Sequence, residues 1–295
     1  MGESSLVVGA GVIGSRVAGM LAERGDSVSV VSRRGSRPAG SAGISHVAAD
    51  AADAGAMTRL AEGVAVIYNC VNPPYHRWPT DWPPIAASVL AAAELSGAVL
   101  VTLSNLYGYG PRVPGGYDQA HPITEATPLA AHQAGRVRVA EVRAADFVGP
   151  GAQSAMGERI VRHVRQGKNV SVLGRADRPH TWSFTGDVAR MLVIAGTDPR
   201  AWGRAWHVPS NEPLSQRQVI GDFARAAGVG RVRVGEIPSV VLAGMGLVSP
   251  LLREVRETEY QFRDDFVMDS SAAQAAFGLK PAPWEEIVAE TVRPR

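Results

Sequence analysis

The sequence contains a single cysteine, Cys70, among 295 residues. One cysteine excludes a disulfide framework within the chain and a metal site built from several thiolates. Lysine is almost as rare, since only Lys168 and Lys280 occur, and no run of five or more like charges is present. We therefore expect no nucleic-acid partner. No two histidines have helical i, i+4 spacing, so we also expect no metal site.

Long hydrophobic runs are absent as well. No apolar run reaches 18 residues, so we expect no membrane-spanning helix. A strand-like run begins within a few residues of Met1, and we therefore expect no signal peptide and a cytoplasmic location. The chain is 45% hydrophobic and 20% charged with a net charge of +2, which is ordinary for a soluble globular protein of one or two domains.

Glycine, by contrast, is abundant, and three glycines near the N-terminus have an informative spacing. The apolar residues 6–8 are followed by Gly9, Gly11 and Gly14 and then by a helical stretch. In a dinucleotide-binding turn, the first glycine allows the bend, the second admits the pyrophosphate and the third lets the helix pack closely. The helix N-terminus would then face the phosphates. The alternative is a structural turn. The predicted cofactor contacts here are Gly9, Gly11, Val12, Ile13 and Gly14.

The end of the second predicted strand, residues 27–31, indicates which dinucleotide binds. NAD sites usually place an acidic residue there for the ribose 2′-hydroxyl, whereas arginine suits a 2′-phosphate. No acidic residue occurs between Asp26 and Asp50, while Arg33 and Arg34 directly follow the strand. We predict NADP as the cofactor, bound in part by these arginines, with NAD as the alternative. A solvated basic loop would explain the same residues.

Apolar runs alternate with helical stretches through the first half of the chain. This pattern is typical of a parallel sheet with crossover helices. We predict an α/β protein with a Rossmann-type doubly wound parallel sheet and a smaller C-terminal region. The dinucleotide-binding domain would comprise residues 1–151 plus about 177–208, and the substrate-binding region about 152–176 plus 209–295. The other predicted strands are 44–47, 64–68, 98–103, 136–143 and 205–208, and the main predicted helices are 84–96, about 152–165 and one beginning near 187.

Further motifs follow the glycine turn in a consistent order. They are Asp50 after the third strand, Ser104-x-x-Tyr107-Gly108 after the fifth, Thr124-Glu125-x-x-Pro128, Val148-Gly149-Pro150-Gly151 and Asp187-Val188-Ala189. Between residue 6 and about residue 190, this set resembles the extended short-chain dehydrogenase/reductases, the NAD-dependent epimerase/dehydratase family. The resemblance implies a nicotinamide cofactor and chemistry on a carbonyl or alcohol group.

The resemblance also implies roles for individual residues. Ser104, at the carboxyl end of a strand where open α/β sheets bind ligands, would hydrogen-bond the reacting oxygen. Tyr107 would contact the substrate and is the best remaining acid. As alternatives, Ser104 caps a turn and Tyr107 packs in the core. Asp50, Asn69 and Val71 would lie against the cofactor.

Four more side chains are substrate-contact candidates. Tyr75 and Trp78 belong to an aromatic cluster in a proline-rich segment, predicted as a loop, that could form a pocket wall or pack against the prolines. By resemblance, His180 and Trp182 would face the substrate pocket. The alternative for His180 is a loop histidine whose hydrogen bonds are satisfied within the protein.

The family's Tyr-x-x-x-Lys pair is missing from this chain. Both lysines lie far from the expected segment, and no tyrosine occurs between Tyr117 and Tyr260. Residues 127–135 could form only a helix of roughly 10 Å, with Thr127 as N-cap and Pro128 in the first position. We infer that a helix of about 20 residues is missing near residues 130–131, through natural loss or because the sequence omits a stretch. His132 is a weak candidate for a stand-in acid.

Three functions are consistent with these residues. The leading hypothesis is an NADP(H)-dependent oxidoreductase or epimerase with an atypical active site, acting on a small carbonyl or alcohol compound. The second is a redox-neutral cyclase, isomerase or dehydratase on the same scaffold, and the third is a non-catalytic NADP sensor. The expected partner is a small-molecule substrate. A homodimer is an open expectation, because the missing segment includes a helix through which relatives dimerise.

Overall fold

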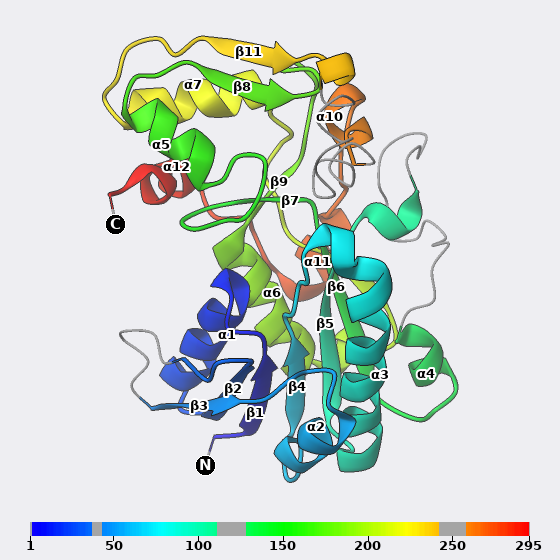
Figure 1. Ribbon diagram of the computed structural model, residues 1–295. Helices are drawn as coiled ribbons and strands as arrows, with labels where there is room; N and C mark the ends of the chain where they lie inside the picture. Colours follow the sequence, from blue (N-terminus) through cyan, green and yellow to red (C-terminus); the bar gives the residue numbers. More distant parts are fainter. Residues whose placement is uncertain (1, 37–42, 111–127, 242–257, 295) are drawn as a thin grey trace. The chain divides into compact units, whose positions relative to one another are not determined.

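The computed structural model describes residues 2–36, 43–110, 128–241 and 258–294 (Figure 1). The chain divides into two compact units. The first comprises Met1–Asn105, Glu125–Arg143 and Val188–Trp206, and the second comprises Leu106–Thr124, Ala144–Asp187 and His207–Arg295. The assignment of cofactor binding to one part and substrate binding to another stays a prediction.

The first unit is built on a seven-stranded sheet in the order β10-β6-β5-β4-β1-β2-β3 (Figure 1). The pairings of β1 with β2 and β4, of β2 with β3, and of β4 with β5 are parallel. The chain reverses direction across the sheet at β1 and β4, as in a doubly wound α/β fold, so the predicted fold class is confirmed. The strands are β1 (Ser4–Val8), β2 (Ser27–Ser32), β3 (Ile44–Ala48), β4 (Val66–Asn69), β5 (Val99–Asn105), β6 (Val139–Ala144) and β10 (Ala205–His207).

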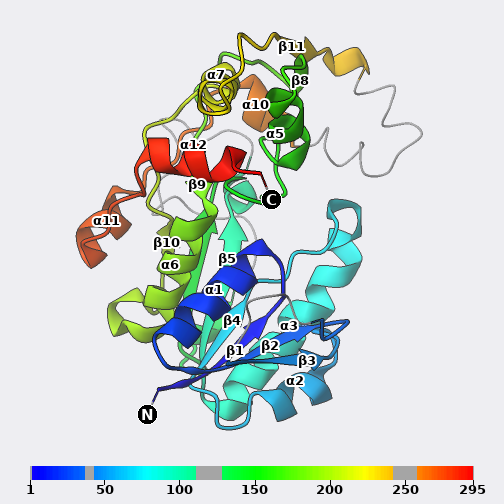
Figure 2. The same ribbon diagram turned by 90° about the vertical axis from the view of Figure 1, so that its left-hand side faces the viewer.

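Helices lie on both faces of this sheet (Figure 2). On one face, Leu100 of β5 shares a hydrophobic core with Met57 of α2 and Val89 of α3. On the other face, Tyr68 of β4 packs against Gly196 of α6. Because successive strand side chains point to opposite faces, each strand contributes to both cores. The helices are α1 (Val12–Glu23), α2 (Ala54–Leu60), α3 (Trp78–Ser96), α4 (Leu129–Gln133) and α6 (Thr185–Thr197).

Helix α3 begins six residues earlier than the sequence predicts. The predicted helix starts at Pro84, whereas α3 starts at Trp78, directly after the 3₁₀ turn η1 (Tyr75–Arg77). Pro79 lies in the first turn, where a missing N–H costs no intrahelical hydrogen bond. The indole N–H of Trp78 donates to the carbonyl of Pro73 at 2.9 Å and holds the helix start in place. The aromatic segment is therefore a helix start and not a loop.

Helix α4 between β5 and β6 contains five residues, Leu129–Gln133. It matches the short helix predicted for this segment, although Pro128 is the N-cap and not the first helical residue. Gly135 follows with a φ of 71°, in the left-handed region expected after a helix end. Thr127, Thr124, Glu125 and Tyr117 lie outside the described residues.

The second unit combines two small parallel sheets with helices. Strand β7 pairs with β9, and β8 pairs with β11, and both pairings are parallel. Helices α5, α7 and α12 form its core through Ile160, Phe223 and Ile287. The elements are β7 (Asp146–Val148), α5 (Glu158–Arg165), β8 (Val170–Leu173), β9 (Trp182–Phe184), α7 (Gln216–Ala226), β11 (Val234–Ile237), α10 (Tyr260–Arg263), α11 (Ser271–Phe277) and α12 (Trp284–Val292).

Candidate cofactor and reaction site

The glycine turn after β1 is fixed at its first position by the protein itself. Gly9 has a φ of 109°, which side-chain-bearing residues rarely adopt. A Cβ added there would lie 2.8 Å from the carbonyl oxygen of Cys70, at the end of β4. The N–H of Gly9 donates to Val31 of β2 at 2.8 Å, which continues the sheet hydrogen bonding into the turn. Glycine at this position therefore follows from backbone geometry and packing.

The other two glycines of the turn differ from each other. A Cβ added to Gly14 would collide with the carbonyl oxygen of Gly9, because helix α1 begins tightly against the turn. A Cβ added to Gly11 would meet no protein atom within 4 Å. Gly11 is the N-cap of α1, no side chain caps this helix end and its first turn contains no acidic residue. The N-terminal N–H groups of α1 are therefore available to an anion.

Asn69 and Val71 lie beside this turn, at the carboxyl end of β4. The N–H of Cys70 donates to Val8 of β1 at 2.8 Å, so the ends of the two strands are joined. Asn69 is buried, and its side-chain oxygen accepts the N–H of Val71 at 3.4 Å. In doubly wound sheets, ligands bind where the strand order reverses, which here is between β1 and β4. The placement fits the predicted cofactor contacts, which stay predictions.

Arg33 and Arg34 occupy a tight turn directly after β2. The N–H of Gly35 bonds to the carbonyl and to the hydroxyl of Ser32, at 3.2 and 3.1 Å, and closes the turn. Both arginines are exposed, and neither has a carboxylate partner in the described part of the chain. The turn therefore presents two uncompensated positive charges at the end of β2.

Asp50 has a local structural role. Its carboxylate accepts the N–H of Ala52 at 3.0 Å and shapes the turn before α2. Asp53, three residues later, caps α2 by accepting the N–H of Ala56 at 2.9 Å. Asp50 is exposed, and its contact with a cofactor stays a prediction.

Ser104 is the penultimate residue of β5 and is half-buried, as expected for a strand-end residue at the ligand-binding edge of the sheet. Tyr107 begins the 3₁₀ turn η2 (Tyr107–Tyr109) and is also half-buried. Tyr109 of the same turn is buried, and its hydroxyl lies 2.8 Å from Nε2 of His207. The catalytic roles of Ser104 and Tyr107 stay predictions.

Tyr75 and Trp78 form a compact aromatic pair. Their ring centroids are 4.8 Å apart with a 34° interplanar angle, and both side chains are half-buried. Contact with the prolines is part of their role, because Trp78 binds the Pro73 carbonyl. The two alternatives for this aromatic pair, a pocket wall and packing against the prolines, both stay predictions.

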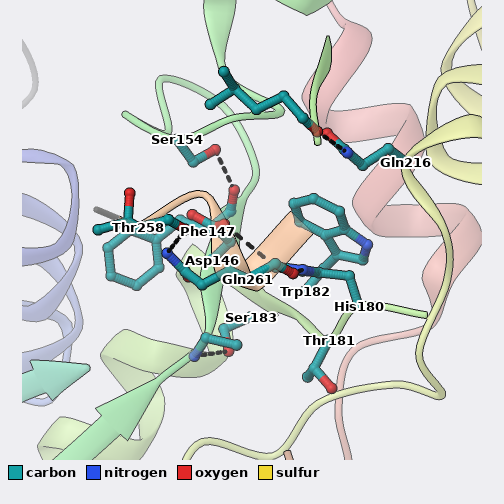
Figure 3. Close-up of polar contacts among 12 residues, drawn as sticks. Asp146, Phe147, Ser154, His180, Thr181, Trp182, Ser183, Gln216, Thr258 and Gln261 are labelled. Atoms are coloured by element: carbon teal, nitrogen blue, oxygen red, sulfur yellow. Dashed lines mark hydrogen bonds and ion pairs between the residues drawn. The ribbon is translucent and has the colours of Figure 1, made fainter. Parts of the chain in front are cut away.

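His180 and Trp182 lie in the interior of the second unit, with exposed fractions of 1% and 3% (Figure 3). The His180 ring stacks on Phe262 at 4.9 Å, and its Nδ1 donates to the carbonyl of Gln261 at 3.1 Å. Its Nε2 lies 3.3 Å from Oδ2 of Asp146. Both rings are thus enclosed within the second unit, with Nδ1 of His180 hydrogen-bonded and Nε2 without a hydrogen bond in the described residues, and their contact with a substrate stays a prediction.

Sequence reasoning missed a buried ion pair in β6. Glu141 and Arg143 are each 3% exposed, and the guanidinium binds the carboxylate through two hydrogen bonds of 3.0 and 3.1 Å. The sequence offered one indication of this ion pair: two opposite charges, two positions apart, lie on the same face of the predicted strand. His132, in contrast, accepts the N–H of Val139 through Nδ1 at 3.2 Å and has a structural role.

Two kinds of feature are absent from the described residues: a metal-binding cluster and a membrane-spanning helix. They contain no cluster of three or more histidine, cysteine or acidic side chains suited to a metal ion. None of the described helices has both the length and the apolar character needed to span a bilayer.

Similarity to known proteins is limited in sequence and extensive in structure. Residues 4–39 match the family model of the pyridine nucleotide-disulphide oxidoreductases. No curated protein sequence matches the chain. The enzyme WbmH of Bordetella bronchiseptica, solved in complex with NAD+, is 18% identical, with a TM-score of 0.75 over 99% of this chain and 97% of WbmH.

Two further solved structures match over nearly their whole length. The dTDP-glucose 4,6-dehydratase of Bacillus anthracis, solved with NAD, is 14% identical, with a TM-score of 0.77 and coverage of 98% of this chain and 95% of the dehydratase. The UDP-glucose 4-epimerase of Thermotoga maritima, solved with UDP-glucose, is 17% identical, with a TM-score of 0.78 and coverage of 98% and 97%. The chain has the fold of the extended short-chain dehydrogenase/reductases. The resemblance stated from the motifs is therefore confirmed for the fold.

Proposed function

We propose that this protein is a nicotinamide-dependent enzyme that reduces, oxidises or epimerises a carbonyl or alcohol compound. One observation carries the proposal. Internal packing explains Gly9 and Gly14, but no atom of another described segment lies within 4 Å of a Cβ added to Gly11. A pyrophosphate seated on the N-terminus of α1 supplies the missing reason, because it needs close approach to the backbone at this residue.

The residues around the turn fit a nicotinamide dinucleotide. The free N–H groups of α1 would hold the pyrophosphate, and Asn69 and Val71 would flank the adjoining ribose. The cofactor supplies hydride transfer when bound. Ser104 would donate its hydroxyl to the reacting oxygen of the substrate. The NAD bound to two structural neighbours supports this assignment, and the nucleotide sugars in the neighbours' names suggest one substrate class to test.

We propose NADP over NAD because of the turn after β2. Arg33 and Arg34 are exposed there, and no acidic side chain is available at this strand end to accept a ribose 2′-hydroxyl. Two guanidinium groups suit a 2′-phosphate, which carries negative charge and several acceptor oxygens.

The central test replaces Gly11 with alanine. Gly11→Ala should leave the free energy of unfolding within about 0.5 kcal/mol of the wild type, since the new methyl group meets no protein atom. Cofactor affinity should fall by at least about tenfold, because the methyl group keeps the pyrophosphate from the backbone. Titration calorimetry with NADP+ and NAD+ measures the affinity, and chemical denaturation measures the stability.

Gly19→Ala is the matched control, because it adds the same methyl group to α1, also without a neighbour within 4 Å. It should stabilise the protein by about 0.5–1 kcal/mol and leave cofactor binding unchanged. Equal cofactor affinity in wild-type and Gly11→Ala protein would contradict the proposed site.

Cofactor choice is tested with the double variant Arg33→Ala plus Arg34→Ala. The variant should lose at least about tenfold in affinity for NADP+ and change little for NAD+, because only NADP+ carries the 2′-phosphate. Arg231→Ala, another exposed arginine in the second unit, serves as a control for a general loss of positive charge. An equal loss of affinity for both dinucleotides would refute the preference for NADP.

Turnover is expected to be slow. The chain has no Tyr-x-x-x-Lys pair, and loss of a positioned general acid typically costs about 10²- to 10⁴-fold in rate. Oxidation of reduced cofactor can be followed by absorbance with a panel of carbonyl compounds that includes nucleotide sugars. Product formation without net change in the cofactor would assign epimerisation or another redox-neutral reaction. Cofactor binding without any product across the panel would favour a sensor.

A further inference from the structure

The Glu141–Arg143 pair lies in an unusual place for two charges. Both side chains are 4% exposed, and they belong to β6, a strand inside the seven-stranded sheet. Burying an ion pair costs several kcal/mol of desolvation per ion, and apolar residues of similar volume are often as stable or more so. The stability of the sheet therefore gives no reason for charges at these positions.

Strand β6, which carries this ion pair, lies next to β5, which carries Ser104. The N–H of Leu100 donates to the carbonyl of Arg138 at 2.8 Å. In a parallel ladder, this bond pairs Val139 with Leu100, and an unbroken ladder of the same offset would pair Arg143 with Ser104. Both strands end one residue further on, at Asn105 in β5 and Ala144 in β6, in agreement with a continuous ladder. Adjacent strands lie roughly 5 Å apart.

The side chains in question share one face of the sheet. Leu100 and Val139 belong to the same hydrophobic core cluster, and side chains two and four positions later point the same way. The face is thus apolar at its amino end and polar at its carboxyl end. At the same offset, Thr102 would lie beside Glu141, and Ser104 would lie beside Arg143. The hydroxyl of Thr102 is buried and has no hydrogen-bond partner in the described part of the chain.

We propose that Arg143, held by Glu141, is a positioning residue that provides the positive charge next to the oxygen bound by Ser104. This inference rests on the proposed function, and it assigns the electrostatic part of the chemistry in a chain that has no lysine in this region. A fixed guanidinium favours negative charge on a substrate oxygen. The negative carboxylate of Glu141 weakens this attraction between the guanidinium and the substrate oxygen. The implied substrates are compounds whose reacting oxygen is, or becomes, an anion.

The two partners should have opposite effects on anion binding. Arg143→Met removes the positive charge and should weaken the binding of acetate and oxamate by at least about tenfold. Glu141→Gln removes the negative charge with almost no change in shape and should strengthen the binding of the same two anions. Arg143→Lys keeps the charge and should retain part of the affinity. The measurement is titration calorimetry on the full chain, with and without NADP+.

Both substitutions break a buried pair, so both should shift the midpoint of urea unfolding to a lower concentration. A purely structural role would move stability and anion binding in the same direction for both variants. Opposite shifts in anion affinity support the proposal, whereas parallel losses, unchanged affinities or no anion binding to the wild type overturn it. The proposed function fails separately, if the wild type binds neither NADP+ nor NAD+.

Discussion

Gly196 shows how one residue near the end of a helix is determined by a distant side chain. It lies in α6, and a Cβ added there would press against the ring and hydroxyl of Tyr68 on β4. Tyr68 is completely buried, its hydroxyl has no hydrogen-bond partner in the described residues, and burial raises its pKa above the usual range. The two residues lie where α6 packs closely on the sheet, so a larger side chain at position 196 would force the Tyr68 ring to move.

We expect Gly196→Ala to lower the free energy of unfolding by about 1–3 kcal/mol, because the added methyl group overpacks the site. Adding Tyr68→Phe should restore part of that loss, since it removes the atom nearest to the new methyl group. Gly221→Ala in α7 is the control: its Cβ meets nothing within 4 Å, so it should stabilise by about 0.5–1 kcal/mol. Urea unfolding measures all three, and a stabilising Gly196→Ala would contradict this account.

At the scale of elements, local sequence determined some boundaries and tertiary contacts determined others. Helix α7 starts where its residues alone indicate, because Ser215 and Gln218 form a capping box with bonds of 3.3 and 2.8 Å. Helix α3 starts earlier than predicted, because a hydrogen bond from Trp78 to Pro73 holds its proline-rich first turns. That hydrogen bond forms only when the turn at Pro73 has its folded conformation, so the helix propensities of the residues do not predict it.

Ser215→Ala should destabilise the second unit by about 0.5–2 kcal/mol, since the first turn of α7 loses the acceptor for an otherwise unpaired N–H. Ser215→Asp keeps an acceptor at the same place and should retain most of the stability. Thermal unfolding followed by circular dichroism gives the comparison. Equal melting temperatures for wild-type and Ser215→Ala protein would show that the cap contributes nothing.

At the scale of the whole molecule, the reactivity of the single cysteine measures how often the folded structure opens. Cys70 follows β4, is 9% exposed, and burial raises the pKa of its thiol to about 12. Its neighbours include Gly9 and Gly14 of the proposed cofactor turn. Because the thiolate is the reactive form, a raised pKa leaves the thiol protonated and unreactive near neutral pH.

Labelling of Cys70 by a thiol-specific disulfide reagent should therefore be slow in the native protein and fast in denaturant. NADP+ should slow it further, because a ligand that binds only the folded state lowers the population of open molecules. The absorbance of the released thiolate follows the reaction, with Gly11→Ala as the variant that should lose this protection. Rapid native labelling that NADP+ does not affect would contradict both the burial and the proposed site.

The sequence by itself determined the strand order of the first unit along the chain, the glycine turn and the absence of the Tyr-x-x-x-Lys pair, because these depend on residues close together along the chain. Only the tertiary structure decided that Gly9 packs against Cys70, that His180 is enclosed by Phe262 and Gln261, and that β6 lies next to β5. Strand order and register create these contacts. They join residues tens of positions apart, and hydrophobic periodicity specifies which face a side chain occupies but not which strand lies beside it.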